Sequence, residues 1–263
     1  MLILLPPSEG KADAGTGRRL DLSRLSLPEL TPAREAVLAA LTTLGRSDDE
    51  EAALAALGLS AGQRGELVRN ARLDRAATAP AGQVYTGVLY EALDLASLPP
   101  DALRTARRSV LVSSGLWGAV RLTDRIPPYR CPIGARLPGV GALSAYWRRV
   151  LPPAMTAAAG AGPVLDLRSA AYAATWTPPA ELAGRTVTVR VLHERQPGVR
   201  TVVSHFNKAT KGRLVRDLLV AGARPRSATA LVSALRELRY TVEEQPVTAA
   251  GRPRQVDVVV TEL

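Results

Sequence analysis

Four basic side chains fall within nine consecutive positions near the end of the chain, and together they could bind a phosphate group. They are Lys208, Lys211, Arg213 and Arg216. The apolar pair Val202-Val203 precedes them, and a helical pattern follows over 208–221. A strand, a basic turn and a helix start in that order are typical of phosphate-binding segments, because basic side chains supply charge and the first N–H groups of a helix supply hydrogen bonds. The alternative is a solvated charged face on a surface helix.

Polar side chains also follow three other apolar segments, and each of these segments is predicted to be a strand. The side chains are Ser8, Glu9 and Lys11 after the first segment, Ser114, Arg121, Asp124, Tyr129, Arg130 and Arg136 after the second, and Arg168, Ser169 and Tyr172 after the third. Ligand sites in α/β proteins form where several strand ends converge. If these loops are neighbours, they enclose a basic cleft with a few carboxylates, and otherwise each is a polar surface connection.

The residue types in these loops predict two kinds of site. Phosphate contacts are predicted for Lys208, Lys211, Arg213, Arg136, Arg130, Arg121, Ser8, Lys11, Ser114 and Ser169. The candidates for acid–base catalysis are Asp124, Asp166, Glu9 and Tyr129, with Asp124 or Asp166 as the general base. Pro127 and Pro128 stiffen the loop around Tyr129, so that its ring is suited to stacking on a base. The alternative is a proline-rich connection whose arginines pair with nearby acids.

The segment 137–145 has the pattern of a hairpin that contacts DNA. Gly139 and Gly141 flank one apolar residue, and such a turn lets backbone N–H groups approach a phosphate, as in helix-hairpin-helix modules. The preceding residues, 127–136, contain three prolines and make a poor first helix. A DNA-contacting hairpin and a plain turn before a helix therefore both remain open.

Metal binding and thiol chemistry are weakly indicated. The candidate soft or imidazole ligands are Cys131, His193 and His205, and no pair of them has the spacing of a known metal motif. We therefore predict no metal and no cofactor. With a single cysteine the chain can form no intramolecular disulfide, which fits a reducing compartment.

The charge balance favours anionic partners. Among 263 residues, 34 are Lys or Arg and 24 are Asp or Glu, which gives a net charge of +10. A surplus of this size favours nucleic acid, nucleotides or a membrane surface. No apolar run approaches the roughly 20 residues of a membrane span, and the apolar start is too short for a signal peptide. We expect a cytoplasmic protein without membrane association, and the sequence leaves its oligomeric state open.

Strands and helices are distributed from the first residue to the last. Strands are predicted over 1–5, 109–113, 163–167, 186–192, 201–204 and 256–261. Helical patterns occupy parts of 31–75 and the segments 140–151, 208–221 and 227–238. With 46% apolar residues, no repeat and no long linker, this order predicts a single domain over 1–263. Its fold class is mixed α/β (α+β), with a mixed central sheet flanked by helices.

Several segments together resemble the YaaA peroxide-stress protein family. The matching segments are Val84-Tyr85-Thr86-Gly87, Ser114-Gly115-Leu116-Trp117-Gly118, Pro128-Tyr129-Arg130, Gly134-Ala135-Arg136-Leu137, Leu165-Asp166-Leu167-Arg168-Ser169, and Val203-Ser204-His205-Phe206 with Lys208 and Gly212. They occur in order over nearly the whole chain. The chain differs from the family between Pro6 and Lys11, where the commoner sequence is Ser-Pro-Ala-Lys.

The resemblance implies a cytoplasmic protein of one domain, with an unusual mixed α/β fold and a positively charged cleft. It also implies protection from hydrogen peroxide, limitation of free intracellular iron, and binding of double-stranded or structured DNA. A helix-hairpin-helix-like element is implicated in that binding, and the family has no securely assigned reaction.

Two functional hypotheses follow. The first is a peroxide-stress protein that binds DNA through a basic cleft and helps limit iron-dependent oxidative damage. The second is an enzyme that acts on a nucleotide, a nucleoside or a DNA base in the same cleft, because carboxylates and tyrosines lie among the arginines. Direct sequestration of iron is the least favoured hypothesis, because the sequence has no obvious cluster of ligands.

Overall fold

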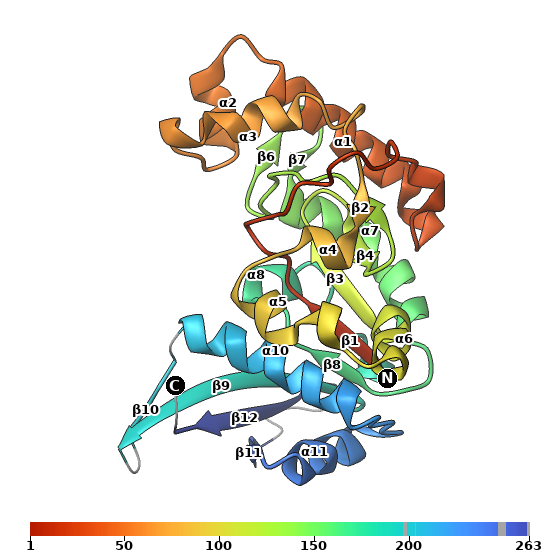
Figure 1. The fold of residues 1–263 in the computed structure, drawn as a ribbon, viewed down its shortest axis with the longest axis vertical. Coiled ribbons are helices and arrows are strands. Elements are labelled where there is room, and N and C mark those ends of the chain that lie inside the picture. The colour runs from red at the N-terminus through yellow and green to blue at the C-terminus, as the bar shows by residue number, and fades with distance from the viewer. Residues whose placement is uncertain (197–198, 203, 247–250, 262–263) are drawn as a thin grey trace.

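A central sheet organises the computed structural model, which describes residues 1–196, 199–202, 204–246 and 251–261 (Figure 1). Its strands are β1 (Leu2–Leu5), β3 (Val110–Ser114), β4 (Gly118–Arg121), β8 (Val164–Asp166), β9 (Thr186–Gln196), β10 (Val199–Thr201), β11 (Thr241–Glu244) and β12 (Arg254–Val260). The strand order is β11-β12-β9-β8-β1-β3-β4, and β10 pairs with β9. Two small pairs lie outside this sheet, β2 (Ala79–Pro80) with β5 (Arg125–Ile126) and β6 (Arg136–Leu137) with β7 (Gly141–Ala142).

The five central strands run parallel, and this explains their apolar sequences. Strands β12, β9, β8, β1 and β3 are paired in parallel, whereas β11 and β4 are antiparallel at the two edges. A parallel sheet is covered on both faces, so its strands are continuous apolar runs, and all four residues of β1 are buried. The carboxyl ends of β1, β3 and β8 therefore meet at one edge of the sheet.

The direction of the connections reverses at β1. The chain passes from β1 to β3 on one side and later reaches β8 on the other side of β1. A crevice forms at the carboxyl edge of a parallel sheet where neighbouring strands send their connections in opposite directions. The topology therefore predicts a ligand site beside Pro6 and Leu167, the residues that follow β1 and β8.

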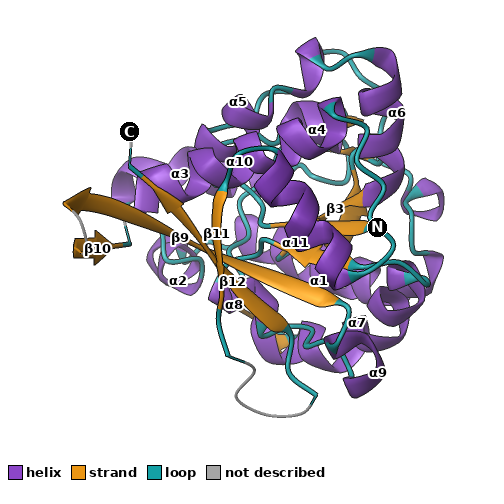
Figure 2. Ribbon diagram, turned by 90° about the horizontal axis from the view of Figure 1, so that it is seen from below, coloured by secondary structure: helices purple, strands orange, loops and turns teal. Residues whose placement is uncertain are grey.

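Helices surround the sheet on both sides (Figures 1 and 2). They are α1 (Thr31–Gly45), α2 (Glu50–Ala56), α3 (Arg64–Asn70), α4 (Ala81–Val84), α5 (Val88–Leu93), α6 (Pro100–Ser109), α7 (Leu143–Ala159), α8 (Ala170–Ala173), α9 (Ala180–Ala183), α10 (Ser204–Val220) and α11 (Ala228–Glu237), with short 3-10 helices at Leu22–Arg24, Pro28–Leu30, Ala61–Gln63 and Leu95–Ser97. Helices α1, α2 and α3 lie at one end of the long axis, and β9 to β12 with α11 lie at the other (Figure 1).

Helix α10 packs directly on α5 at Gly212. A Cβ atom at this position would lie 2.2 Å from the carbonyl oxygen of Leu89 and 3.0 Å from the backbone nitrogen of Leu93. Glycine is needed here because any larger residue would drive its Cβ into the backbone of α5. The contact fixes where the first turns of α10 lie relative to the carboxyl edge of the sheet.

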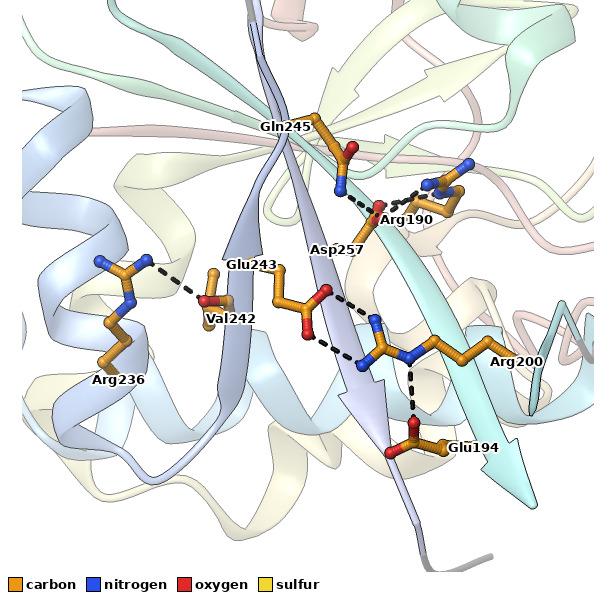
Figure 3. Close-up of polar contacts among 8 residues, drawn as sticks. All are labelled: Arg190, Glu194, Arg200, Arg236, Val242, Glu243, Gln245 and Asp257. Atoms are coloured by element: carbon orange, nitrogen blue, oxygen red, sulfur yellow. Dashed lines mark hydrogen bonds and ion pairs between the residues drawn. The ribbon is translucent and has the colours of Figure 1, made fainter. Parts of the chain in front are cut away.

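The far end of the sheet carries charged pairs on one face (Figure 3). Arg190 donates to the buried carboxylate of Asp257 at 2.8 Å, and the side-chain amide of Gln245 donates to the same carboxylate at 2.8 Å. Arg200 pairs with Glu243 at 2.6 Å. These contacts join β9, β10, β11 and β12, and they support β9 where it extends beyond the rest of the sheet (Figures 1 and 2).

The mixed α/β fold with a central sheet flanked by helices is confirmed. The strands predicted over 1–5, 109–113, 163–167, 186–192 and 256–261 are confirmed as β1, β3, β8, β9 and β12. In the described part of the chain, none of the helices combines the length and the apolarity that a bilayer crossing needs.

The predicted basic turn before Lys208 is wrong. Helix α10 begins at Ser204, so that Lys208 is its fifth residue, and Lys208 and Lys211 are neighbours on one helical face. In place of the strand predicted over 201–204, the structure has β10, which ends at Thr201. Val203 lies outside the described residues. No glycine or proline interrupts 204–211, so the polar side chains there are compatible with a helix.

Two further elements differ from the prediction. The connection predicted over 114–136 contains β4 and β5, and the unpredicted strand β11 forms an edge of the sheet. Edge strands such as Thr-Val-Glu-Glu in β11 pair on one side only and have a weak apolar signal. Helix α7 begins at Leu143 rather than at 140, and it continues to Ala159 through Pro152 and Pro153.

The hairpin predicted at 137–145 forms between two short strands, β6 and β7. Gly139 and Gly141 have φ angles of +72° and +84°, which explains why glycine occupies both positions. The residues before β6 form a loop, so no helix leads directly into this turn as in a helix-hairpin-helix module. The turn before a helix is thus confirmed, because α7 follows β7 immediately.

Candidate functional site

A cavity of about 630 Å³ opens at the carboxyl edge of the sheet, beside the ends of β1 and β8. Its wall combines the loop 6–11, the start of α5, the segment 129–134, the loop after β8 and the first turns of α10. The predicted site residues that line it are Ser8, Glu9, Lys11, Tyr129, Arg130, Ser169, Lys208 and Lys211. All four polar segments singled out in the sequence therefore contribute to one cavity.

The cavity contains every lysine of the chain. The sequence has three lysines, Lys11, Lys208 and Lys211, beside 31 arginines, and all three line this wall. Lys11 follows the first strand, whereas the other two lie nearly 200 residues later on α10. Everywhere else in the sequence, side-chain cations other than histidine are arginines.

Lys11 is half-buried and lies against an aromatic ring. Its Nζ donates to the carbonyl oxygens of Ser8 at 2.9 Å and Glu9 at 3.3 Å, and it lies 4.3 Å from the ring centre of Tyr129. Burial and, to a lesser extent, the nearby charge of Arg130 together lower the pKa of Lys11 to about 8. Lys11 is therefore an amine that can lose its proton near neutral pH.

The loop that carries Lys11 is tied to the start of α5. The hydroxyl of Ser8 donates to the carbonyl oxygen of Gly10 at 2.6 Å and accepts from the backbone N–H of Thr86 at 3.1 Å. The hydroxyl of Tyr90 donates to the carbonyl oxygen of Pro6 at 2.7 Å. Since the side chain of Ser8 orders this loop, its oxygen is already engaged by the backbone.

Tyr129 belongs to a buried chain of hydroxyl groups. Its oxygen lies 2.6 Å from the hydroxyl of Ser114 and 2.9 Å from that of Tyr85. The Ser114 oxygen already accepts from the N–H groups of Leu116 and Trp117, so its own hydrogen is directed to Tyr129. Burial raises the pKa of Tyr129 well above its ordinary value, so Tyr129 remains a neutral phenol.

Arg130 supplies a cation to the cavity from a fixed backbone. Its N–H donates to the side chain of Asn70 at 3.0 Å, and its carbonyl oxygen accepts from the Asn70 amide at 2.7 Å. Its guanidinium lies 3.2 Å from the carboxylate of Glu9, which is 85% exposed. Pairing with so exposed a carboxylate is weak, so Arg130 can also serve an anion in the cavity.

Helix α10 presents an exposed and a half-buried lysine to the same space. Lys208 is exposed, whereas the Nζ of Lys211 donates to the carbonyl oxygen of Leu167 at 3.2 Å. Burial lowers the pKa of Lys211, and the charge of Asp166 opposes that shift. The side-chain oxygen of Asn207, on the same turn, is buried and accepts no hydrogen bond among the described residues.

Asp166 and Arg168 form a buried ion pair that shapes the loop after β8. The guanidinium of Arg168 donates to both carboxylate oxygens of Asp166, at 2.9 and 2.7 Å, and also to the carbonyl oxygens of Tyr172 and Trp176. Both oxygens of Asp166 are therefore engaged. The pair positions Tyr172, which lines the cavity.

The model of the peroxide stress protein YaaA family matches residues 1–245. The chain belongs to the YaaA peroxide stress protein family. It is similar to a UPF0246 protein of Streptomyces coelicolor, with 59% identity over 263 residues and full coverage of both chains. A UPF0246 protein of Corynebacterium glutamicum is 38% identical over 253 residues, covering 94% of this chain and 96% of the relative. A UPF0246 protein of Idiomarina loihiensis is 28% identical over 196 residues, covering 73% and 72%.

In this YaaA-family chain, the candidate general base Asp124 lies away from the cavity. One of its oxygens accepts from the N–H and the hydroxyl of Ser26, at 3.1 and 2.7 Å, and the other accepts from the N–H of Arg121 at 2.9 Å. Beside it, the buried guanidinium of Arg34 donates to backbone carbonyl oxygens, including those of Trp117 and Ala119. Asp124 therefore organises a buried turn in this structure.

Other candidates also lie outside the cavity wall. Ser114 lies behind Tyr129, and the side chain of Arg121 donates to the carbonyl oxygen of Arg108. Arg213 is exposed on α10. Arg136, Gly139 and Gly141 border a separate hollow next to α1 and α2. A phosphate contact at any of these positions stays a prediction.

Cys131 lines the cavity as an unreactive thiol. Burial raises its pKa to about 12, so it remains protonated at neutral pH. Across the described ranges, no three His, Cys, Asp or Glu side chains are grouped as metal ligands. Sequence reasoning missed Asn207 and Cys131 as cavity residues, although each is adjacent to a predicted cation.

Proposed function

We propose that this YaaA-family chain binds double-stranded or structured DNA in the peroxide stress response, through the cavity and the cations around it. The single observation that carries this proposal is the gathering of Lys11, Arg130, Lys208 and Lys211 on one wall. They come from three segments that are distant in the sequence, so the gathering is a property of the fold. Four cations beside one cavity favour an anionic ligand, and phosphate is the anion that DNA offers at regular spacing.

The proposed binding is electrostatic and largely independent of sequence. Phosphate contacts set position and affinity but carry no sequence information directly. By covering DNA, the chain would help limit iron-dependent oxidative damage to it, in line with the description of its family as peroxide stress proteins.

A gel-shift salt series on random duplex DNA tests this proposal. The affinity is expected to fall linearly with salt on logarithmic axes. Replacing Lys208 and Lys211 by alanine should weaken binding to all sequences alike and reduce the salt slope by about two. The matched control is Arg224→Ala with Arg226→Ala, which removes the same charge from an exposed connection beyond the far end of α10.

Two outcomes would contradict the proposal. One is the absence of any complex at low salt with correctly folded protein. The other is an equal loss of affinity and slope in the two double variants, because binding would then follow total charge rather than the cavity.

The alternative function is an enzyme that acts on a nucleotide, a nucleoside or a DNA base in the same cavity. It is favoured by the cavity volume of about 630 Å³, which falls within the range of small-molecule sites. A thermal-shift screen with nucleotides, nucleosides and sugar phosphates tests it. A ligand at 100 times its Kd should stabilise the fold by about 2.7 kcal/mol, and a screen without any shift would count against a small-ligand site.

A further inference from the structure

The choice of lysine rather than arginine at the cavity calls for a chemical reason. Arginine holds phosphate through two parallel hydrogen bonds and is never deprotonated in proteins, so it would serve anion binding at least as well. This chain uses arginine for 31 of its 34 basic residues, yet the cavity has all three lysines. Lysine differs in that a buried amine can lose its proton and act as a nucleophile.

We propose that Lys11 is a nucleophile that forms an imine with an aldehyde or ketone, in a ligand whose phosphate is held by Arg130 and Lys208. This proposal rests on the proposed function in one respect, namely that the cavity binds a ligand with a phosphate group. It adds that the ligand also has an aldehyde or ketone group, and that this group forms a covalent bond with Lys11. Two sources share this chemistry. One is a sugar in DNA that has lost its base and exposes its aldehyde, and the other is a free sugar phosphate.

The position of Lys11 suits an amine that acts without a proton. A neutral amine has two N–H bonds and one lone pair, and the carbonyl oxygens of Ser8 and Glu9 lie at 2.9 and 3.3 Å to accept the two N–H bonds. The lone pair is then left for a carbonyl carbon. Among the described residues Lys11 has no ion pair, so no carboxylate stabilises its ammonium form directly.

Some of the charged groups around Lys11 lower its pKa and another raises it. Arg130 and Arg69 lower its pKa, whereas Glu66 raises it, and burial is the largest effect. The sum leaves a pKa of about 8, so a useful fraction of neutral amine is present near neutral pH. Lysines activated in this way are typical of enzymes that form imines with carbonyl substrates.

The rest of the wall suits the other parts of such a ligand. Arg130 and the exposed Lys208 can pair with phosphate oxygens, and the ring of Tyr129 holds Lys11 from one side at 4.3 Å. The hydroxyl of Tyr129 is engaged by Ser114 and Tyr85, so it is not needed for the reaction.

The reaction balances without an oxidant or a reductant. The nitrogen of Lys11 forms a bond to the carbonyl carbon, and the π bond of the carbonyl breaks as its oxygen takes up a proton. The nitrogen then gives up one proton, the hydroxyl group takes up a proton and leaves as water, and the freed nitrogen lone pair forms the second carbon–nitrogen bond. Overall, neutral amine, carbonyl compound and one proton give a protonated imine and water. The Lys211 ammonium, on the same wall, is a group that can supply the proton.

Reductive trapping tests this proposal on the full chain. The protein is incubated with sodium cyanoborohydride and one of three probes: a duplex with a single base-free deoxyribose, glyceraldehyde 3-phosphate, or phosphate-free glyceraldehyde at equal concentration. The expected result is a covalent adduct that peptide mapping places on Lys11, in at least one phosphate-bearing arm and far more than with glyceraldehyde. The two phosphate-bearing arms distinguish DNA from a free sugar phosphate.

Substitutions of the lysines distinguish the role of Lys11 as a nucleophile from its role as a positive charge. Lys11→Arg keeps a positive charge and should abolish the adduct, whereas Lys208→Arg keeps a cation for the phosphate and should retain it. Mapping in the wild-type chain keeps the test valid even if the Lys11 variant folds poorly. The trapping rate should also rise with pH through about pH 8, the pKa of Lys11.

The proposal is overturned if neither phosphate-bearing arm gives an adduct, or if the adduct is spread equally over Lys11, Lys208 and the amino terminus. A gel shift of intact duplex on the same samples reports the proposed DNA binding separately. Binding without trapping overturns the imine alone, and trapping of the free sugar phosphate without any gel shift overturns DNA binding alone.

Discussion

At the residue scale, the cavity depends on groups that are already satisfied by the protein. The hydroxyl of Ser8 and the carboxylate of Asp166 bind neighbouring atoms of their own loops, and Arg168 holds both oxygens of Asp166. The groups that line the cavity and could contact a ligand are the side-chain nitrogen atoms of Lys11, Arg130 and Lys208. The site is therefore suited to anions, which accept hydrogen bonds, and to carbonyl groups, whose carbon atom accepts an electron pair from an amine.

The lowered pKa of Lys11 predicts a pH dependence of stability. From about pH 8 to its ordinary pKa of 10.5, the unfolded chain keeps a proton on Lys11 that the folded chain has lost. Stability contributed by Lys11 therefore rises with pH in this window, by up to about 1.4 kcal/mol per pH unit. Lys11→Met should remove this rise, as measured by urea unfolding at pH 7.5, 8.5 and 9.5.

The comparison with wild type isolates Lys11, because the buried tyrosines contribute equally to both chains. Lys208→Met, at an exposed position on α10, is the control and should keep the wild-type pH profile. Equal profiles for the Lys11 variant and the wild type would show that Lys11 is no drier than a surface lysine.

The residue types at the site were predictable, whereas their exact partners were not. The polar loops after apolar strands pointed to Ser8, Lys11, Tyr129 and Lys208, and all four line the cavity. Asp124 was chosen from the same loop pattern. Its bonds to Ser26 join residues almost 100 positions apart, and no local pattern reveals such a pairing.

At the scale of elements, the position of α10 decides where two of the three lysines lie. Sequence reasoning placed a basic turn after Val202-Val203 and within 204–213, because a strand, a basic turn and a helix start are typical of phosphate-binding segments. The structure continues the helix through this segment. Helix propensity is a weak signal for such residues, and the packing of α10 on α5 settles the conformation.

Gly212→Ala tests how closely α10 must pack on α5. The new Cβ would lie 2.2 Å from the carbonyl oxygen of Leu89, so α10 has to move. We expect a loss of about 1–3 kcal/mol in the free energy of unfolding, which outweighs the gain of about 1 kcal/mol in helix propensity. The proposed binding of DNA should weaken as well, because Lys208 and Lys211 move with the helix.

The control for this prediction is Gly65→Ala in α3, where the new Cβ has no neighbour within 4 Å. Only the propensity gain applies there, so this variant should be slightly more stable than wild type. If the two alanine variants were equally stable in thermal unfolding, the tight contact at Gly212 would be refuted.

At the scale of the whole molecule, the sheet order was the least predictable feature. Apolar runs identified β1, β3, β8, β9 and β12, because both faces of a parallel sheet are buried. Nothing in those runs states that β1 lies between β3 and β8. That order creates the crevice, and Lys11 lines the cavity there together with two lysines that are almost 200 positions away.

The net charge of +10 predicted an anionic partner, but a net charge does not indicate where such a partner would bind. The exposed arginines are spread over the molecule, and many form surface pairs that contribute little, such as Arg46 with Asp74. The cavity is distinguished by the kind of cation it holds rather than by total charge.

The restriction of lysine to one cavity also determines how the protein responds to common laboratory reagents. Coupling to a sensor surface or a dye through side-chain amines can occur only at Lys11, Lys208 and Lys211. An immobilised or labelled sample is therefore a sample with a blocked cavity, unless the amino terminus is used instead. For the same reason, a protease that cuts after lysine has its three cleavage sites in this wall, and protection from it is a direct readout of cavity occupancy.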